Sequence, residues 1–484
     1  MYLKIFKSKI IFSYIIFFIF FISLFVSSCH KDENYITDTS VKLSFSNDSI
    51  SFDTVFTTIG STTKILKIYN NEKRPLLISS IYLAGGSSSN FRINVDGVPG
   101  ISFKDVEING NDSLWIFVRV TVDPGNQSTP FIITDSIVFN TNGNIQDVKL
   151  CAWGQDAYYH TPTEHIEGLP PFSYAGCASA WANDKPHVIY GYTVVDTDST
   201  LIIQAGTKIH LYKNAVIWVY NGGSIKVNGN KDNPVIFQGT RLEQYYNDMP
   251  GQWNKIWLSA GSKDNVINYA IIKNGTIGIQ ADTLGSLVSP TLRLSNTIIK
   301  NMSSAALWGQ GSHIWAVNSV FANCGLYNII LSIGGKYSFK HCTAGNFWNY
   351  STRTSPALLL NNYYKDYLGN YQVRSLDSAY FGNCIIYGSN NDEIGLDRFS
   401  SASVFNYNFD HCLIKTTLNI SDTIFYKSII KNIDPLFINN QTVNYNISTG
   451  SPAINAGKNL NVITDILGNM RDAQPDIGAY EYVP

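Results

Sequence analysis

Charge is scarce in this sequence. Asp, Glu, Lys and Arg make up 15% of the 484 residues, and the formal net charge is −1. Without Lys4, Lys7 and Lys9, which precede a long apolar run, 32 basic residues face 36 acidic ones. Domains that bind nucleic acids need an excess of basic side chains to neutralise phosphates. We therefore expect no nucleic-acid partner, and the aromatic content of 13% favours uncharged or glycan partners.

The short phrases that mark metal sites are also missing. The sequence contains no His-x-His and no Cys-x-x-Cys. Both phrases place two ligands on one side of a chain segment, which is the usual start of a transition-metal site. We predict no metal and no cofactor. His313, His341 and His411 are the histidines of the repeat region, and we interpret His341 and His411 as structural.

A short phrase is repeated six times, and its second residue is always small. The repeats are separated by steps of 27, 22, 23, 42 and 28 residues. Short β-rich units with such periods are typical of a solenoid, in which each coil stacks on the previous one. The small positions should form one buried column, and three of its members are cysteines that act there as small hydrophobes. The column consists of Ala270, Thr297, Ser319, Cys342, Cys384 and Cys412.

The N-terminus resembles a bacterial lipoprotein signal. An apolar run over 10–26 follows the three lysines, and Val26-Ser-Ser-Cys29 resembles a lipobox. The resemblance implies a signal peptide over 1–28 and a lipid on Cys29 that anchors the chain in an outer membrane. Within the acidic tether over 29–40, the charged patch His30-Lys-Asp-Glu-Asn34 resembles the surface-export signal of Bacteroidetes lipoproteins, with a plain solvated tether as the alternative. A signal anchor or transmembrane helix is the alternative, because the apolar run is near the length of a span.

The residues 41–155 read as short alternating strands separated by turns rich in Asn and Gly. This pattern predicts a β-sandwich of immunoglobulin-like size. The phrases Phe52-Asp-Thr-Val-Phe and Val118-Arg-Val-Thr-Val-Asp-Pro resemble the abnormal-spindle/hydin type of immunoglobulin-like domain, which implies a spacer or interaction module. The irregular residues 156–186 are interpreted as a junction and an N-terminal cap. Cys151 and Cys177 flank this junction, and a disulfide between them remains open.

The residues 187–450 are predicted to form the solenoid, so we expect an all-β chain. Pro250-Gly-Gln-Trp-Asn-Lys-Ile-Trp and Asn268-Tyr-Ala-Ile-Ile resemble right-handed parallel β-helix proteins of Bacteroidetes. In such a coil, Asn296, Asn318 and Asn383 should bond to their equivalents above and below. The 42-residue step predicts an extra rung or a long loop, with Tyr350–Asp377 as the insertion.

The residues 451–484 resemble the C-terminal segment known as choice-of-anchor Q, through Ser451-Pro-Ala-Ile-Asn-Ala-Gly and Pro475-Asp-Ile-Gly-Ala-Tyr-Glu-Tyr. We expect this segment to cap the last rung. Arg471, Asp476 and Glu481 should form a structural ion network there rather than a catalytic group.

The solenoid fold also raises a catalytic alternative, since many β-helix enzymes cleave polysaccharides. Hydrolases of this kind use clustered carboxylates, and lyases use a base together with calcium or arginine. The sequence has no Asp-Asp pair and no Gly-His-Gly, so we predict no catalytic residue. The leading hypothesis is a non-catalytic lipoprotein of the cell surface that binds polysaccharide or surface proteins. A polysaccharide lyase or glycoside hydrolase is the alternative, and a purely structural envelope component remains open.

Two sets of side chains are candidates for contact and modification. Aromatic rings stack on the apolar faces of sugars, so ligand contacts are predicted at Trp308, Trp348, Tyr363, Tyr364 and Tyr367, with ordinary packing as the alternative. The phrase Asp-(Ser/Thr)-apolar recurs and resembles the O-glycosylation acceptor of Bacteroidetes envelope proteins, although Asp-Ser and Asp-Thr also open strands. The predicted acceptors are Ser49, Thr54, Ser113, Ser136, Thr283, Ser378 and Thr423.

Overall fold

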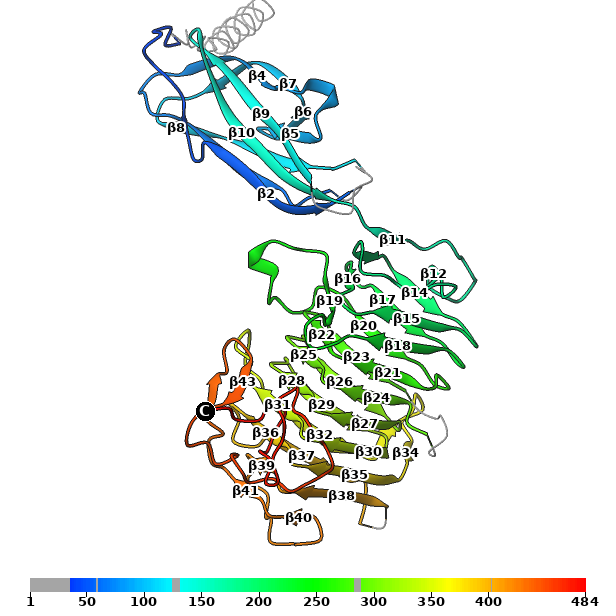
Figure 1. The fold of residues 1–484 in the computed structure, drawn as a ribbon. Helices are drawn as coiled ribbons and strands as arrows, with labels where there is room; N and C mark the ends of the chain where they lie inside the picture. The colour runs from blue at the N-terminus through cyan, green and yellow to red at the C-terminus, as the bar shows by residue number, and fades with distance from the viewer. Residues whose placement is uncertain (1–34, 58–59, 124–130, 283–288, 402) are drawn as a thin grey trace, which may run out of the picture. The chain divides into compact units, whose positions relative to one another are not determined.

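The computed structural model describes residues 35–57, 60–123, 131–282, 289–401 and 403–484. Its contacts divide into two compact units, the first with its described residues between 35 and 152 and the second mainly from Trp153 to Pro484. Strands make up nearly all of the regular structure in both units (Figure 1). Two short 3-10 turns occur in the described part of the chain, η1 (Gly86–Ser88) and η2 (Gln244–Tyr246).

The first unit is a sandwich of two sheets, and the strand pairs of both sheets are antiparallel where their register is known. Phe52 of one sheet packs on Phe91 of the other, with ring centroids 5.9 Å apart. The first sandwich sheet contains β1 (Ser44–Phe45), β3 (Lys64–Asn70), β8 (Asp112–Val120), β5 (Phe91–Val95) and β6 (Val98–Gly100). The second contains β2 (Ser49–Phe56), β10 (Asn144–Gln155), β9 (Phe131–Thr141), β4 (Leu76–Leu83) and β7 (Ser102–Ile108).

The second unit is a parallel β-helix with three long sheets, so the predicted fold class of a sandwich followed by a right-handed parallel β-helix is confirmed. The longest sheet, here the eleven-stranded sheet, begins inside the predicted junction. In spatial order it contains β11 (Tyr158–His160), β13 (His187–Ile189), β16 (Lys208–Leu211), β19 (Val235–Gly239), β22 (Ala270–Lys273), β25 (Ile298–Lys300), β28 (Val320–Ala322), β31 (Thr343–Asn346), β36 (Ile385–Gly388), β39 (Leu413–Ile414) and β41 (Ile430–Lys431).

The second sheet of the β-helix is called the aromatic sheet, for the side chains on its outer face. Its strands each follow a strand of the eleven-stranded sheet along the chain. They are β12 (Phe172–Tyr174), β14 (Tyr192–Val195), β17 (Val216–Val219), β20 (Lys255–Leu258), β23 (Ile277–Ala281), β26 (Ala305–Gln310), β29 (Tyr327–Ser332), β32 (Leu358–Asn361) and β37 (Ile394–Asp397).

The third sheet completes each coil. It contains β15 (Thr200–Gln204), β18 (Ser224–Asn228), β21 (Asn265–Asn268), β24 (Leu292–Ser295), β27 (His313–Val317), β30 (Gly335–Lys340), β35 (Leu376–Gly382), β38 (Phe405–Asp410) and β40 (Tyr426–Lys427). Apolar side chains from all three sheets fill the interior of the helix. Among them, the rings of Phe339, Phe381 and Phe409 stack in sequence at 5.0 Å.

The repeated phrase forms the bend between the third sheet and the eleven-stranded sheet. Its first residue has a positive φ in every copy, from 47° at Asn318 to 53° at His411. Asparagine tolerates this left-handed backbone better than most residues. The predicted side-chain ladder is confirmed where Asn318 Nδ2 donates to its equivalent Asn296 Oδ1 at 3.3 Å, and where Asn383 Nδ2 lies 2.9 Å from the equivalent His341 Nε2. Asn296 Nδ2 instead donates at 3.0 Å to Asn268, which precedes the equivalent bend residue Tyr269. Cys342, Cys384 and Cys412 are buried as predicted.

The long 42-residue step contains no additional coil among the described residues. One strand of the aromatic sheet, β32, and one of the third sheet, β35, lie within it. The predicted insertion over Tyr350–Asp377 is therefore wrong in its extent, because the apolar residues of β32 belong to the core. Two separate excursions account for the length: the segment 347–357, and the hairpin of β33 (Tyr363–Lys365) and β34 (Tyr371–Val373).

The C-terminal segment lies along the outer face of the eleven-stranded sheet, whereas we expected it to cap the last rung. Asn318 Nδ2 donates to the Thr464 carbonyl at 2.7 Å, and the Gly478 amide donates to the Asn383 carbonyl at 2.9 Å. The physical reason is that β28, β36 and β39 turn apolar side chains outward, and these need cover. An antiparallel hairpin of β42 (Phe437–Asn439) and β43 (Asn444–Ile447) precedes the segment and lies outside the three long sheets.

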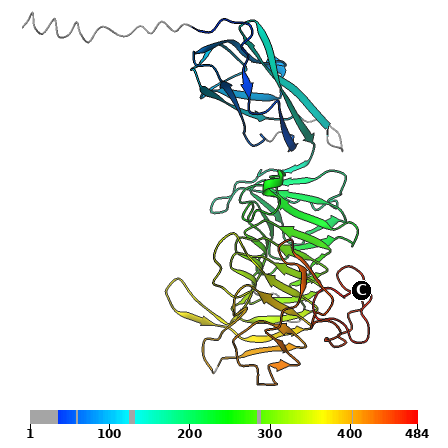
Figure 2. The ribbon, with the colours of Figure 1, turned by 90° about the vertical axis from the view of Figure 1, so that its left-hand side faces the viewer.

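The predicted ion network of this segment is confirmed. Arg471 Nη1 donates to Glu481 Oε2 at 2.7 Å, and Nη2 of the same arginine donates to Asn318 Oδ1 at 3.2 Å. The Asp476 carboxylate accepts from the backbone amides of Asn455 and Tyr482. Figure 2 shows the β33–β34 hairpin and the C-terminal segment on different sides of the β-helix.

Candidate ligand-binding face of the β-helix

A column of aromatic and polar side chains follows the outer face of the aromatic sheet. Inner and outer side chains alternate along each strand, so Ile217 and Val219 enter the core whereas Trp218 between them points outward. The parallel register places the outward residues of successive strands beside one another. We name this column the aromatic strip, and it consists of Tyr174, Trp218, Trp257, Gln280 and Trp308, with Val194 between the first two.

The centre of the aromatic strip is a stack of two indoles. The rings of Trp218 and Trp257 lie 5.0 Å apart at an interplanar angle of 11°. Tyr220 meets Trp218 edge to face at 5.4 Å, and the Lys255 Nζ lies 4.9 Å from the centroid of the Trp257 ring. The buried Nε1 of Trp218 has no hydrogen-bond acceptor among the described residues. The sheet therefore presents a preformed aromatic surface with a polar rim.

Polar residues at the ends of the strands fix the orientation of Trp257 and Trp308. Trp257 Nε1 donates to Asp282 Oδ2 at 2.6 Å, and Gln280 Nε2 donates to the other oxygen of the same carboxylate at 2.8 Å. Trp308 Nε1 donates to Ser332 Oγ at 3.0 Å. An indole whose N–H is satisfied in this way keeps its ring in one position, which lowers the entropic cost of binding a ligand.

A second carboxylate lies near the far end of the same face. Asp397 accepts from Asn361 Nδ2 at 2.9 Å and from the Tyr363 hydroxyl at 3.0 Å. Four strand spacings separate it from Asp282, which amounts to ~19 Å at ~4.8 Å per strand. An acid and a base that act together on a glycosidic bond lie roughly 5–9.5 Å apart. These two carboxylates therefore do not form a hydrolytic pair and instead hold aromatic side chains.

The predicted contact residues border this face. Trp308 belongs to the aromatic strip itself. Tyr363 follows β32, and its ring packs against Tyr371 and Phe399 at 5.7 and 5.5 Å. Tyr364 is partly exposed in the same hairpin, and Tyr367 at its tip is 96% exposed.

Trp348 lies in the segment that leads into β32, so it borders the opposite edge of the sheet. Its ring packs on Tyr350 at 5.0 Å, and its Nε1 donates to Ser351 Oγ at 2.9 Å. The structure thus places Trp308 on the face, with Tyr363 and Trp348 on the chain segments that leave and enter it.

Acidic and basic groups also meet in one place outside the aromatic strip. Asp410 is buried and accepts from Lys458 Nζ, from His411 Nδ1 at 2.8 Å and from the Tyr380 hydroxyl at 3.2 Å. Burial opposes ionisation of Asp410, but the hydrogen bonds from Lys458 and His411 outweigh it and hold its pKa below the ordinary value. Lys458 belongs to the C-terminal segment, so this cluster fastens that segment to the coil of β38.

The remaining histidines of the repeat region are buried. His341 accepts a hydrogen bond at Nε2 from Asn383 Nδ2 at 2.9 Å if the Nδ1 tautomer is present, and burial lowers its pKa to about 3. Burial also lowers the pKa of His313. In the part of the chain that the structure describes, no group of three or more His, Cys, Asp or Glu side chains could hold a metal ion.

Sequence reasoning did not single out Trp218, Gln280, Asp282 or Asp397. The signal was present in the strand phrases Val-Ile-Trp-Val and Lys-Ile-Trp-Leu, which place Trp218 and Trp257 at equivalent positions. The two aspartates carry no sequence signal, because their role depends on which strand ends lie side by side.

The predicted lipidation and O-glycosylation residues differ in their exposure. Cys29 and Thr283 lie outside the described residues. Ser49 and Thr423 are exposed, and Thr54, Ser113, Ser136 and Ser378 are half-buried. The Asp112 and Asp135 carboxylates accept from the amides of Ser113 and Ser136, as expected for residues that open strands.

Cys151 and Cys177 are free thiols in the structure. Within the described ranges, we find no helix with the length and apolarity to cross a membrane.

Comparison with known proteins supports the β-helix. Residues 177–303 match the family model described as a pectate-lyase-like β-helix domain. No curated protein matches this chain.

Matches among solved structures include a family 123 glycoside hydrolase from Clostridium perfringens, with 9% identity and a TM-score of 0.17, over 24% of this chain and 30% of that one. The periplasmic chaperone SfaE matches with 14% identity and a TM-score of 0.16, over 24% of this chain and 58% of that one. This chain thus spans less than two thirds of either protein. The catalytic domain of a GH87 α-1,3-glucanase, in a complex with nigerose, matches with 11% identity and a TM-score of 0.19, over 81% of this chain and 91% of that one. Superpositions at these TM-scores carry no argument about function.

Proposed function

We propose that this chain is a lipid-anchored protein of the outer membrane that binds glycan on its aromatic sheet without cleaving it. The observation that carries the proposal is the aromatic strip, in which Trp257 and Trp308 are held by hydrogen bonds from their indole nitrogens. Fixed indole faces stack on the apolar faces of pyranose rings, and the neighbouring amide and hydroxyl groups bond to sugar hydroxyls.

A binding role fits the polar residues of this face better than a hydrolytic one. Asp282 already accepts two hydrogen bonds from the aromatic strip, and Asp397 accepts two from Asn361 and Tyr363. A general acid must instead be free to reach the glycosidic oxygen. The half-buried Lys255 donates to Gln280 Oε1 at 2.7 Å, which completes a polar rim suited to hydroxyl groups.

The test is a binding panel of neutral and uronate-containing oligosaccharides against the mature full-length protein. We expect at least one oligosaccharide to bind and to be recovered intact, and we expect Trp257→Ala to weaken that binding by about tenfold or more. Trp315→Ala is the matched control, because Trp315 is 44% exposed on the third sheet. No retained saccharide, or equal weakening by both substitutions, would refute the proposal.

A polysaccharide lyase or glycoside hydrolase is the second candidate. Two observations favour it: the match of residues 177–303 to a pectate-lyase-like β-helix model, and the cluster of Asp410, His411, Lys458 and Tyr380. Incubation with uronate-containing polysaccharides separates the two candidates. Ultraviolet-absorbing unsaturated ends that vanish in Lys458→Ala would establish a lyase, and new reducing ends without them would establish a hydrolase.

The lipid anchor on Cys29 has its own test. We expect metabolic labelling with a radioactive fatty acid to mark the wild-type protein, and Cys29→Ala to abolish the label and release the protein from the membrane fraction. Accessibility to protease added to intact cells would then show whether the anchored protein faces the exterior. A labelled Cys29→Ala protein would contradict the assignment.

A further inference from the structure

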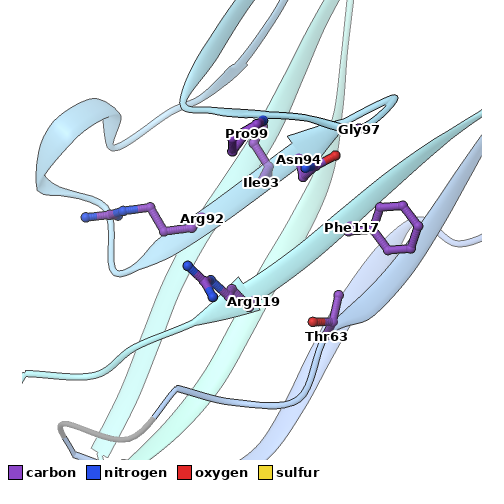
Figure 3. A pocket seen from close by; sticks show the side chains of 8 residues that line it. All are labelled: Thr63, Arg92, Ile93, Asn94, Gly97, Pro99, Phe117 and Arg119. Carbon is purple, nitrogen blue, oxygen red and sulfur yellow. The ribbon is translucent and has the colours of Figure 1, made fainter.

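A pocket of 460 Å³ opens on the outer face of the first sandwich sheet, within the first unit (Figure 3). Strands β3, β5 and β8 and the β5–β6 turn surround it. The side chains of Arg92, Asn94, Phe117 and Arg119 point outward from the sheet, because their neighbours along the strands, Ile93 among them, are buried in the sandwich core. The pocket is lined by Thr63, Arg92, Ile93, Asn94, Gly97, Pro99, Phe117 and Arg119.

Two arginines stand directly opposite each other in this pocket. Arg92 of β5 and Arg119 of β8 are register partners in the antiparallel pair. Like charges in this position destabilise a sheet. Arg92 Nη1 donates to the carbonyls of Ser89 and Phe91. Among the described residues, neither arginine forms an ion pair with a carboxylate. The pair therefore concentrates two positive charges that no carboxylate of the described residues neutralises through an ion pair.

Exposed rings lie next to these charges. Phe117 is 37% exposed and lies between Ile65 and Asn94 in the register of the sheet. Two residues before it, Trp115 is 40% exposed and carries the Lys67 Nζ 3.9 Å above its ring centroid. Aromatic rings at such exposure favour a partner that covers them, and the arginines favour a partner with a negative charge.

We propose that this pocket binds an acidic saccharide, with a carboxylate or sulfate held by Arg92 and Arg119 and a sugar face stacked on Phe117. Guanidinium groups bind planar or tetrahedral oxyanions through paired N–H donors, and two of them on adjacent strands match one such group. Asn94 and Thr63 supply amide and hydroxyl groups for the sugar hydroxyls. The site is independent of the aromatic strip, since it lies on the other unit and selects for charge.

A saccharide fits this site better than an acidic peptide does. The charged and the aromatic parts of the site lie within a single pocket of 460 Å³, which suits one compact ligand that carries both an anion and a ring face. An acidic peptide would instead spread several carboxylates over a longer basic track.

The test is calorimetric titration of the mature full-length protein with trigalacturonate, a sulfated tetrasaccharide, maltotriose and hexaglutamate. We expect one of the two acidic saccharides to bind, and maltotriose not to compete for the site. Arg119→Ser and Arg92→Ser should each weaken binding by about tenfold or more, since each removes charged hydrogen bonds. Lys104→Ser is the matched control, because it removes one positive charge from β7 of the other sandwich sheet.

The outcomes are distinct. Preference for trigalacturonate identifies a carboxylate ligand, and preference for the sulfated probe identifies a sulfate ligand; either supports the site if both arginine variants lose it and Lys104→Ser keeps it. Equal loss in Lys104→Ser, a preference for hexaglutamate, or no binding of acidic saccharide at about 1 mM overturns the proposal. An unchanged thermal midpoint in Arg119→Ser shows that the fold is retained. Trp308→Ala should leave this binding intact, so failure here is separable from failure of the aromatic strip.

Discussion

Two outer faces of the same β-helix differ in what covers them. On the eleven-stranded sheet, Val320, Ile385 and Leu413 point outward and are nonetheless buried, since Ala479 and Ile477 of the C-terminal segment pack against them. On the aromatic sheet, the outward column carries large rings and polar groups from Trp218 to Trp308, with aliphatic residues on either side at Val194 and Ile330. In this β-helix, the outward side chains are small or aliphatic where the C-terminal segment covers the sheet, and they are large or polar along the aromatic strip.

The asparagines at the bend between the third sheet and the eleven-stranded sheet connect the covered outer face of the eleven-stranded sheet to the C-terminal segment. Asn318 and Asn383 have side chains that serve the coil and also bind the C-terminal segment: Arg471 donates to Asn318 Oδ1, and the Lys458 amide donates to Asn383 Oδ1 at 3.1 Å. The covered face is thus fastened at several points along the helix. Among the described residues, the hydrogen bonds of the aromatic strip stay within its own sheet and strand ends, so its surface can exchange water for a ligand.

The largest expected effect on stability comes from removing the ion pair that holds the C-terminal segment together. Arg471→Ala should destabilise the folded chain by about 3–5 kcal/mol, because it leaves Glu481 buried without its partner. Chemical denaturation measures this change, and the exposed Arg398→Ala is the matched control. Comparable losses in the two variants would show that the C-terminal ion pair contributes nothing particular to stability.

A smaller effect is expected from crowding the same interface. A Cβ at Gly345 would lie 2.4 Å from the Tyr445 ring, so Gly345→Ala should cost about 1–3 kcal/mol through overpacking. Combining it with Tyr445→Leu should recover part of the loss in a double-mutant cycle. Strict additivity of the two substitutions would contradict the observed contact.

His341, at the bend beside the covered sheet, should make the free energy of unfolding depend on pH. Burial depresses the folded-state pKa of His341 to about 3, so the unfolded chain takes up a proton first as pH falls. The stability that His341 contributes is present above its unfolded pKa of about 6.5 and is lost as pH falls toward 3, at up to ~1.4 kcal/mol per pH unit.

Asparagine occupies the equivalent bend in other coils, so His341→Asn should fold and reduce this pH dependence. Denaturation curves measured between pH 6.5 and 4 provide the readout. His411→Asn, the same substitution at the equivalent bend of a later coil, is measured for comparison. An unchanged slope would mean that His341 is not excluded from protonation in the folded state.

The smallest effect on stability is expected on the aromatic strip. Trp308 is half-buried, so Trp308→Ala should change the free energy of unfolding by only about 1 kcal/mol while it weakens saccharide binding. Paired denaturation and binding curves separate the two quantities. A loss of several kcal/mol would place Trp308 with the covered face and remove the distinction between the two faces.

The sequence predicted the parts of the fold that follow from periodicity. The small column from Ala270 to Cys412 and the ladder asparagines stand where the repeat placed them, because stacking imposes the same environment on each coil. The extent of the insertion could not be predicted, since Leu358–Asn361 reads equally well as a loop or as a strand until it is paired with its neighbours.

The candidate site was predicted only in part. Trp308 was identified by residue type, whereas Trp218 and Asp282 gain their roles from a neighbouring coil. Trp218 pairs with Trp257, 39 residues further along the chain, and Asp282 accepts a hydrogen bond from the same Trp257, 25 residues before it. The course of the C-terminal segment was also missed, because the apolar outward residues that receive it look like core residues in a single sequence.

Hydroxyl-radical footprinting of the full-length protein, with and without a bound saccharide, tests the central claim most directly. Trp257 and Trp308 face the solvent on the aromatic sheet, and Trp315 on the third sheet serves as an internal reference. We expect the saccharide to protect Trp257 and Trp308 from oxidation and to leave the oxidation of Trp315 unchanged. Protection of Trp315 alone, or of none of the three by a saccharide that does bind, would contradict it.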